Sequence, residues 1–299
     1  MQNKFSKYIG ASIILAIIVL VVVTFFGKLN SMNFNGASSS EASKIQSNEQ
    51  RCKLKYHPSP KEMMDCIRVD KKFKSEQLKN INAAKAYQQK EAKMKKLLAE
   101  KNIDYQTLEV YIRVIKQEEL VELWAKDRTI NQEFQFIKSY KLCLTNNHDG
   151  LRGIDLLIPE SFYTVVEFLP YDPYYARLLT DFPTACEKLR GRTGGGIALH
   201  GGCFSTYCSP LTDEDIKEVY IMAVEARSKG QWNVPIHNFP ARLNDSIFNT
   251  LKANPKYNKD EKLIALWKNL KPMYDYFELK RKLLKYTHND KGEYIFSEE

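Results

Sequence analysis

The sequence predicts an α+β protein with a sheet-rich domain in its C-terminal two-thirds. Between residues 109 and 200, short runs rich in β-branched and aromatic residues are separated by Asp, Gly and Pro turns, as in a sheet. After residue 210, apolar residues recur at helical spacing. Before residue 105 the chain contains an uncharged apolar run and a lysine-rich helical stretch. The sheet is therefore expected to form one domain, preceded by helical segments.

The composition is that of an ordinary globular protein, with 43% hydrophobic and 27% charged residues in 299. The net charge of +9 suits an anionic partner such as nucleic acid, a membrane surface or a cell-wall polymer. We do not expect nucleic acid, because no nucleic-acid-binding motif is present and the lysines are spread along helical segments. The 6 cysteines are too few for a scaffold built on disulfides.

The first segment, residues 1–28, is expected to be a transmembrane signal anchor. A run of about 19 apolar residues at ~1.5 Å rise spans roughly 28 Å, close to the hydrocarbon thickness of a bilayer. Lys4 and Lys7 precede this run and Lys28 follows it, which favours an N-terminus in the cytoplasm and the rest outside. A cleaved signal peptide is the alternative, but the sequence after Phe26 matches a cleavage site poorly.

Residues 29–60 are rich in Ser, Asn and Gly, which predicts a flexible linker. Residues 61–104 predict a helical arm. Its apolar stripe comprises Ile81, Ala84, Tyr87, Met94, Leu97 and Leu98. Its lysines suit either a helix that contacts anionic lipid or polymer or a solvated arm, and the solvated arm is favoured because charge runs usually face water. The pairing of Cys52 and Cys66 stays open.

The third segment, residues 105–299, contains the predicted strands. Residues 110–116 and 119–125 form a hairpin around Gln117 and Glu118, and further strands are expected at 134–144, 161–169 and 196–200. A helix follows, with Thr212 as N-cap and Gly230 as stop signal. A second apolar stripe precedes Pro272, and an apolar cluster follows it.

His200 and Cys208 lie in the segment most suggestive of a reactive site, a run of small and flexible residues from 194 to 208. Residue types alone leave three alternatives: a structural disulfide between Cys203 and Cys208, a metal site, or a nucleophilic thiol activated by the imidazole. The metal site is the weakest alternative, because a single nearby His lacks the second ligand pair that zinc requires.

Several segments also occur in a recognisable order: residues 111–116 with Leu123 and Trp124, then 140–143, 159–163, 191–195, His200-Gly201, Ser205-x-x-Cys208, Thr212-Asp213, 267–271 and 294–296. In this order they resemble the YafK-like branch of the YkuD-type L,D-transpeptidases, enzymes that remodel bacterial peptidoglycan through a cysteine. The resemblance extends from residue 112 to residue 296. It implies a catalytic domain at 105–299 built as a mixed β-sandwich with flanking helices.

The resemblance implies a role for each site residue. Cys208 corresponds to the nucleophile, His200 to the general base and acid, and the carbonyl of Gly201 orients the imidazole. Backbone N–H groups at Cys208 and its neighbours, Tyr207 included, would hold the oxyanion. Substrate contacts are expected from Arg190, Arg192 and Ser205, and no metal or cofactor is implied. Cys203 is then expected to be free or paired with Cys143 or Cys186.

The chain departs from the family pattern at two glycine positions. Tyr207 replaces the glycine before the nucleophile, so either the loop is less strained than in relatives or its oxyanion site is shifted. Ser161 also replaces a glycine. Like its branch, the chain has Ser209 and Pro210 after the nucleophile and lacks the arginine that many relatives carry there.

The activity implied is acyl transfer through a Cys208 thioester on stem peptides that contain meso-diaminopimelate. The implied location is the bacterial inner membrane, with a single-pass anchor and the catalytic domain in the periplasm. Two alternatives are a hydrolase of the same family (an L,D-carboxypeptidase, an endopeptidase, or an enzyme that releases a lipoprotein linked to diaminopimelate) and a non-catalytic, membrane-tethered wall-binding protein. The sequence does not decide between transfer and hydrolysis, because pocket shape and water access choose the acceptor. It does not indicate an oligomeric state either.

Overall fold

The computed structural model describes residues 72–130, 133–144, 151–171 and 175–297. The chain divides into two compact units, residues 1–47 and 48–299, and all described residues belong to the second. The predicted anchor, the predicted linker and the first part of the predicted arm lie outside the described residues. Within the described ranges, no helix is long and apolar enough to cross a membrane.

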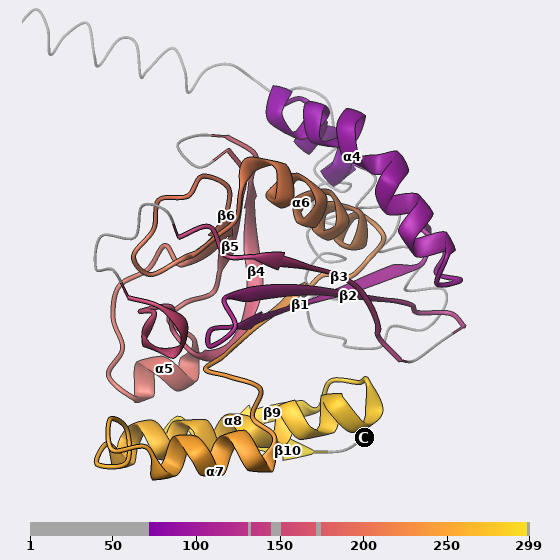
Figure 1. Cartoon of the computed structure of the whole chain (residues 1–299). Coiled ribbons are helices and arrows are strands. Elements are labelled where there is room, and N and C mark those ends of the chain that lie inside the picture. The colour runs from indigo at the N-terminus through magenta and orange to yellow at the C-terminus, as the bar shows by residue number, and fades with distance from the viewer. Residues whose placement is uncertain (1–71, 131–132, 145–150, 172–174, 298–299) are drawn as a thin grey trace, which may run out of the picture. The chain divides into compact units, whose positions relative to one another are not determined.

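A large mixed sheet forms the centre of this unit (Figure 1). Within the described residues its order is β3-β2-β1-β8-β4-β5-β6-β7. β1 pairs in parallel with β8, and β6 with β7, whereas the other neighbours are antiparallel. The strands are β1 (Leu108–Ile115), β2 (Leu120–Asp127), β3 (Gln135–Lys141), β4 (Ser161–Leu169), β5 (Arg177–Thr180), β6 (Ala198–His200), β7 (Ser209–Pro210) and β8 (Pro235–Phe239).

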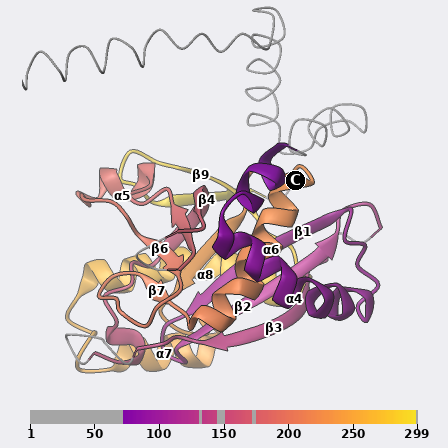
Figure 2. The ribbon, with the colours of Figure 1, turned by 90° about the horizontal axis from the view of Figure 1, so that it is seen from above.

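Helices lie on both faces of the sheet (Figures 1 and 2). On one face α6 packs against the sheet and α4 packs against α6, while α7, α8 and a separate two-stranded hairpin lie on the other. The elements are α4 (Ile81–Ala99), η1 (Gly153–Asp155), α5 (Ala185–Leu189), α6 (Asp213–Ser228), α7 (Asp245–Ala253), α8 (Glu261–Lys280), β9 (Lys285–His288) and β10 (Tyr294–Ser297). The α+β prediction is thereby confirmed.

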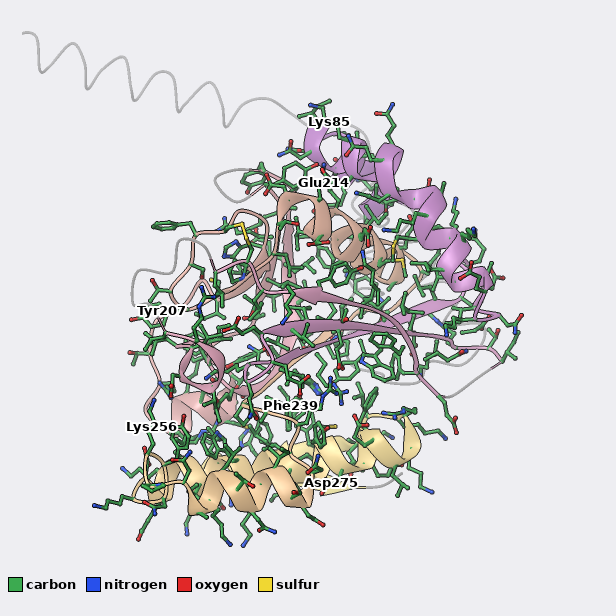
Figure 3. All side chains as sticks on the ribbon, in the orientation of Figure 1. Lys85, Tyr207, Glu214, Phe239, Lys256 and Asp275 are labelled. Atoms are coloured by element: carbon green, nitrogen blue, oxygen red, sulfur yellow. A yellow bond between two sulfur atoms is a disulfide. The ribbon has the colours of Figure 1, made fainter. Side chains whose placement is uncertain are left out.

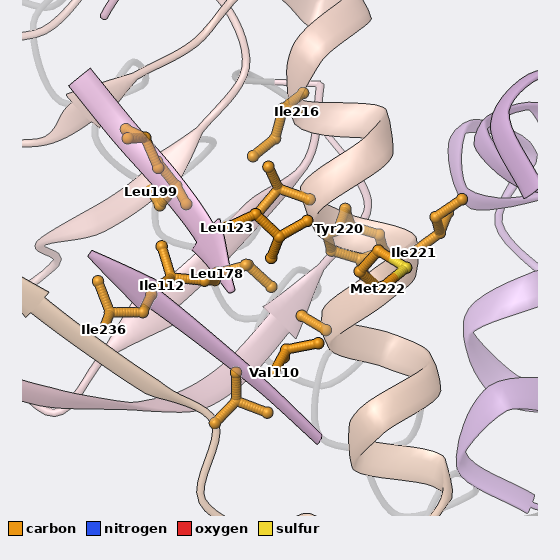
Figure 4. Close-up of a cluster of buried hydrophobic side chains, with 14 of the residues drawn as sticks. Val110, Ile112, Leu123, Leu178, Leu199, Ile216, Tyr220, Ile221, Met222 and Ile236 are labelled. Atoms are coloured by element: carbon orange, nitrogen blue, oxygen red, sulfur yellow. The ribbon is translucent and has the colours of Figure 1, made fainter. Parts of the chain in front are cut away.

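The core beneath α6 follows from the two-residue period of the strands. Val110, Ile112 and Val114 of β1 are fully buried in it, together with Ile216 and Tyr220 of α6 (Figure 4). Fully burying an apolar side chain of this size is worth about 1.5–3 kcal/mol, so these contacts stabilise the packing of α6 on the sheet.

α4 buries one face against α6 and is solvated only on the other. Tyr87, Met94 and Leu98 of the predicted stripe are buried, whereas Ile81 is 64% exposed. The Tyr87 hydroxyl donates to Glu225 of α6 at 2.8 Å. The described part of the arm therefore shares the core of the sheet domain.

Most predicted strands are confirmed within a few residues, and the 161–169 strand coincides with β4. Thr212 caps α6 as predicted, accepting the backbone N–H of Asp215 at 3.1 Å. α8 runs through Pro272, so the apolar stripe and the cluster after it belong to one helix. Burial of Trp267 and Phe277 on either side offsets the cost of a proline inside the helix, about 3 kcal/mol.

Arg113 of β1 is a buried charge that joins the sheet to α8. Its side chain is 1% exposed and lies 2.7 Å from Glu122 of β2 and 2.6 Å from Glu278 of α8. Its guanidinium also lies over the rings of Trp124 and Phe277 at 5.3 and 5.1 Å. Because a buried charge is stabilised by each further partner, the contact with Glu278 favours the observed position of α8 on the sheet.

We expect Arg113→Met to lower the free energy of unfolding of the whole protein by about 3 kcal/mol, because it leaves the buried Glu122 carboxylate with fewer partners. Urea unfolding measures the change. The matched control is Lys256→Met, which removes an exposed pair with Asp155 and should cost less than about 1 kcal/mol (Figure 3). Equal costs for the two variants would contradict this role of Arg113.

Candidate active site

The parallel pairing of β6 with β7 brings His200 and Cys208 together. The chain leaves β6 at His200, loops through residues 201–208 and returns beside β6 as β7, with Leu199 opposite Ser209. Cys208 directly precedes β7 and therefore comes beside the start of β6. Its thiol donates to the carbonyl of Gly196 at 3.6 Å. Two positions along a strand correspond to about 7 Å, so the register places Cys208 and His200 in the same part of the sheet.

His200 is held in one tautomer. Its ring is buried, and Nδ1 lies 2.7 Å from the carbonyl oxygen of Gly201. A carbonyl only accepts, so Nδ1 carries the hydrogen and Nε2 is the nitrogen that can take a proton. Burial lowers the pKa of His200, the charge of Arg177 lowers it further, and the bond to Gly201 opposes both. At neutral pH the ring is thus an uncharged base.

Cys208 is a half-buried free thiol. Burial raises its pKa, while hydrogen bonds from the Ala198 backbone and Ser205 and the charge of Arg177 oppose that rise. Cys208 and His200 therefore rest as a neutral thiol and a neutral imidazole. A base must remove the thiol proton before the sulfur becomes a nucleophile.

The raised pKa has a measurable consequence for alkylation. We expect the rate at which iodoacetamide modifies Cys208 to rise with pH, with a midpoint above that of an ordinary thiol, because burial raises the pKa of Cys208. Peptide mass spectrometry of the whole protein resolves Cys208 from the buried Cys186. Full reactivity already at pH 7 would show that the site stabilises the thiolate more strongly than burial opposes it.

Ser205 shapes the turn before the nucleophile. The backbone N–H of Cys208 donates to Ser205 Oγ at 2.9 Å, and that hydroxyl donates to the Cys208 carbonyl at 3.3 Å. The N–H expected to hold the oxyanion is therefore bound to Ser205 in this structure. Substrate binding by Ser205 stays a prediction, while its described contacts organise the loop.

A disulfide between Cys143 and Cys203 fastens the same loop. The two Cα atoms lie 4.9 Å apart, and Cys143 also donates its backbone N–H to the carbonyl of Pro210 at 2.8 Å. Of the alternatives left open for Cys203, pairing with Cys143 is confirmed, and Cys186 and Cys208 are free. The loop between His200 and Cys208 is thus tied to the end of β3.

The double variant Cys143→Ser/Cys203→Ser is expected to lose about 4 kcal/mol of the free energy of unfolding, because the disulfide closes a loop with a sequence separation of 60. Urea unfolding of the whole protein provides the measurement. Cys186→Ser is the control for loss of a thiol alone. A loss in the double variant no larger than in this control would mean that the disulfide contributes little.

No protein-family model matches the chain. Among curated proteins, "Putative L,D-transpeptidase YafK" of Escherichia coli (strain K12) is 33% identical over 177 residues, covering 58% of this chain and 68% of the relative. The protein of the same name from Escherichia coli O157:H7 matches equally. The chain belongs to the L,D-transpeptidase family. Its place is in the YafK-like branch, as the ordered segments predicted.

Solved structures resemble this L,D-transpeptidase family member only distantly. Bd1075 of Bdellovibrio bacteriovorus gives a TM-score of 0.34 at 20% identity. The match covers 56% of this chain and 59% of Bd1075, so this chain spans less than two thirds of the length of Bd1075. The helical cell shape determining protein Pgp2 from Campylobacter jejuni gives a TM-score of 0.32 at 17% identity, and the match covers 65% of this chain and 80% of Pgp2. These scores are low, so the sequence match to YafK carries the family assignment.

The two departures from the L,D-transpeptidase pattern have structural explanations. The side chain of Tyr207 is 54% exposed, and its backbone does not adopt the left-handed conformation. In the same loop, Gly202 does adopt it, with φ 74°. Tyr207 therefore brings no left-handed backbone strain to the loop, and the position of the oxyanion site stays a prediction. Ser161 is buried, and its hydroxyl lies 2.5 Å from that of Tyr294, joining β4 to β10.

The two arginines predicted to contact substrate lie after α5 rather than beside His200 in the sheet. Arg190 donates to the carbonyl of Gly292 at 3.3 Å and lies over the ring of Tyr294. Arg192 is exposed in the loop that leads to β6. Substrate binding by either residue stays a prediction.

Sequence reasoning missed Arg177, which pairs with His200 in the sheet. Its strand has four residues and follows a Pro- and Tyr-rich turn, so no periodic signal marks it. Among the described residues, no group of three or more His, Cys, Asp or Glu side chains is arranged to hold a metal ion.

Proposed function

We propose that this family member is a peptidoglycan-remodelling L,D-transpeptidase-like enzyme that acts through a Cys208 thioester on stem peptides containing diaminopimelate. One observation carries the proposal: the free Cys208 thiol directly precedes the strand that pairs with the strand of His200, and the buried His200 imidazole has its Nδ1 held by the Gly201 carbonyl. This is the arrangement that a thiol nucleophile and its general base require. Membership of the L,D-transpeptidase family supplies the substrate class.

The chemistry would begin when the Cys208 side chain turns from the Gly196 carbonyl toward His200. Nε2 takes the thiol proton, and the sulfur attacks the carbonyl carbon at the L-centre of the donor residue. As the tetrahedral intermediate collapses, the C–N bond breaks and His200 returns the proton to the leaving amine. A thioester remains on Cys208. An acceptor amine or a water molecule then attacks it, the C–S bond breaks, and the thiol is regenerated.

The oxyanion would need a donor during this sequence. The Cys208 N–H can serve once substrate displaces the Ser205 hydroxyl from it, since a developing negative charge is a stronger acceptor than a neutral oxygen. Tyr207 would contribute through its backbone, as the resemblance implies. Whether an amine or water completes the reaction decides between transpeptidation and hydrolysis, and hydrolysis includes release of a lipoprotein joined to diaminopimelate.

We further propose that residues 1–28 anchor the chain in the bacterial inner membrane and that the domain at 105–299 faces the periplasm. The apolar run and its flanking lysines support the anchor. The Cys143–Cys203 disulfide supports the location, because disulfides persist in oxidising compartments such as the periplasm.

Incubating muropeptides with the whole purified protein, followed by mass spectrometry, tests the proposal. Wild type should produce cross-linked or exchanged peptides if it transfers, and shortened or released peptides if it hydrolyses. Cys208→Ala should lose this activity by about a thousandfold or more, since the nucleophile is removed. Cys186→Ala removes the other thiol that is free within the described residues and should retain the activity.

A Cys208→Ala variant with an unchanged product distribution would refute the thioester mechanism. Binding of wild type to peptidoglycan without any product would instead favour the non-catalytic wall-binding protein. The Cys186→Ala control excludes a general effect of losing a cysteine.

A further inference from the structure

β5 and β6 are neighbouring strands (Figure 1), and the register places Arg177 opposite His200. Partners in adjacent strands direct their side chains to the same face of a sheet. The next pair, Leu178 and Leu199, is buried in the core beneath α6. Because side chains alternate, Arg177 and His200 both point to the opposite face, where the candidate active site lies.

The backbone around Arg177 is held on both sides. The carbonyl of Ala176 accepts the N–H of Gly201 at 3.0 Å, and Gly201 is the residue whose own carbonyl orients His200. On the other side, Leu178 is fully buried. Arg177 is half-buried, with its Nε atom buried.

The charge of Arg177 reaches both groups of the catalytic pair. Burial lowers the pKa of His200, and Arg177 lowers it further. Burial raises the pKa of Cys208, and Arg177 is one of the influences that oppose this rise. A positive charge at this position makes His200 a weaker base as long as no anion compensates it.

We propose that Arg177 is a substrate-binding residue whose guanidinium pairs with a carboxylate that the acyl donor carries beside its scissile bond. A guanidinium offers a planar fork of donors that matches a carboxylate. Pairing compensates the charge of Arg177, so His200 regains basicity when the donor is in place. The inference rests on the proposed function and names the feature of the donor that the site recognises.

Arg190 and Arg192 are less suited to this role. The Arg190 guanidinium is engaged with the carbonyl of Gly292 and the ring of Tyr294. Arg192 is exposed on a loop with glycines at positive φ, at residues 194 and 196. Of the three arginines, Arg177 is the one placed beside His200 by strand pairing.

A diaminopimelate-containing donor offers two carboxylates near the scissile bond: the one on the diaminopimelate side chain, and the terminal one of the residue that follows. Three synthetic tetrapeptides distinguish them: one with both acids free, and two that each carry one acid as the amide. Turnover of each peptide is measured with the whole protein as wild type, Arg177→Gln, Arg177→Lys and, as control, Arg152→Gln, a change at an exposed arginine outside the predicted site.

Wild type should prefer the free peptide over one of the two amides by about tenfold or more in kcat/KM, as expected for a hydrogen-bonded charge pair. Arg177→Gln should lose that preference, Arg177→Lys should keep part of it, and Arg152→Gln should retain it fully. Arg177→Gln should also move the acidic limb of the kcat/KM profile to higher pH, because His200 no longer faces the charge. The burial of His200 and its hydrogen bond to the Gly201 carbonyl should be unchanged in Arg177→Gln.

The outcomes separate this inference from the proposed function. If wild type turns over the peptides and Arg177→Gln keeps the same preference, the inference is wrong and the function stands. If wild type turns over none of them, the function is in doubt, and calorimetric titration of the peptides onto Cys208→Ala decides the inference alone. Equal affinities there for the free and both amidated peptides would overturn it.

Discussion

The candidate active site depends on the pairing of β6 with β7. β7 has only two residues and is held by bonds on both sides: the N–H of Leu211 donates to the His200 carbonyl at 2.8 Å, and that of Cys143 donates to the carbonyl of Pro210 at 2.8 Å. Parallel strands are ordinarily joined by about a dozen residues or more, and here residues 201–208 suffice. Such a short connection brings the base and the thiol to adjacent strands.

The connection is stabilised by contacts of its own. The Cys143–Cys203 disulfide attaches it to the end of β3, and the N–H of Gly202 donates to Asp213 at the start of α6 at 2.8 Å. Ser205 closes the turn before Cys208. On the face of the sheet opposite α6, two buried charged groups contact α8. Arg113 pairs with Glu278, and Glu160, which lies 2.7 Å from Lys116, accepts a hydrogen bond from Trp267 at 2.6 Å. The site is thus built on a sheet supported from both faces.

Elements that depend on residues close together in the chain were predicted correctly from the sequence. The alternation of β4 and the N-cap at Thr212 depend on neighbours in the chain, and both were correct. β8 was not predicted, although it lies in the middle of the sheet. Its sequence begins with Pro235 and contains His237 and Asn238, polar residues that the sheet buries. Such residues fit a central strand only because the fold supplies partners, such as Tyr111 for His237.

The sequence by itself determined the fold class, the family and the candidate nucleophile and base, because these follow from periodicity and from an ordered set of short segments. Only the tertiary structure decided which cysteine pairs with Cys203, that Tyr207 avoids a left-handed backbone, and that Arg177 faces His200. The physical reason is that pairing across a sheet joins residues distant in sequence, and register leaves no local mark on either strand.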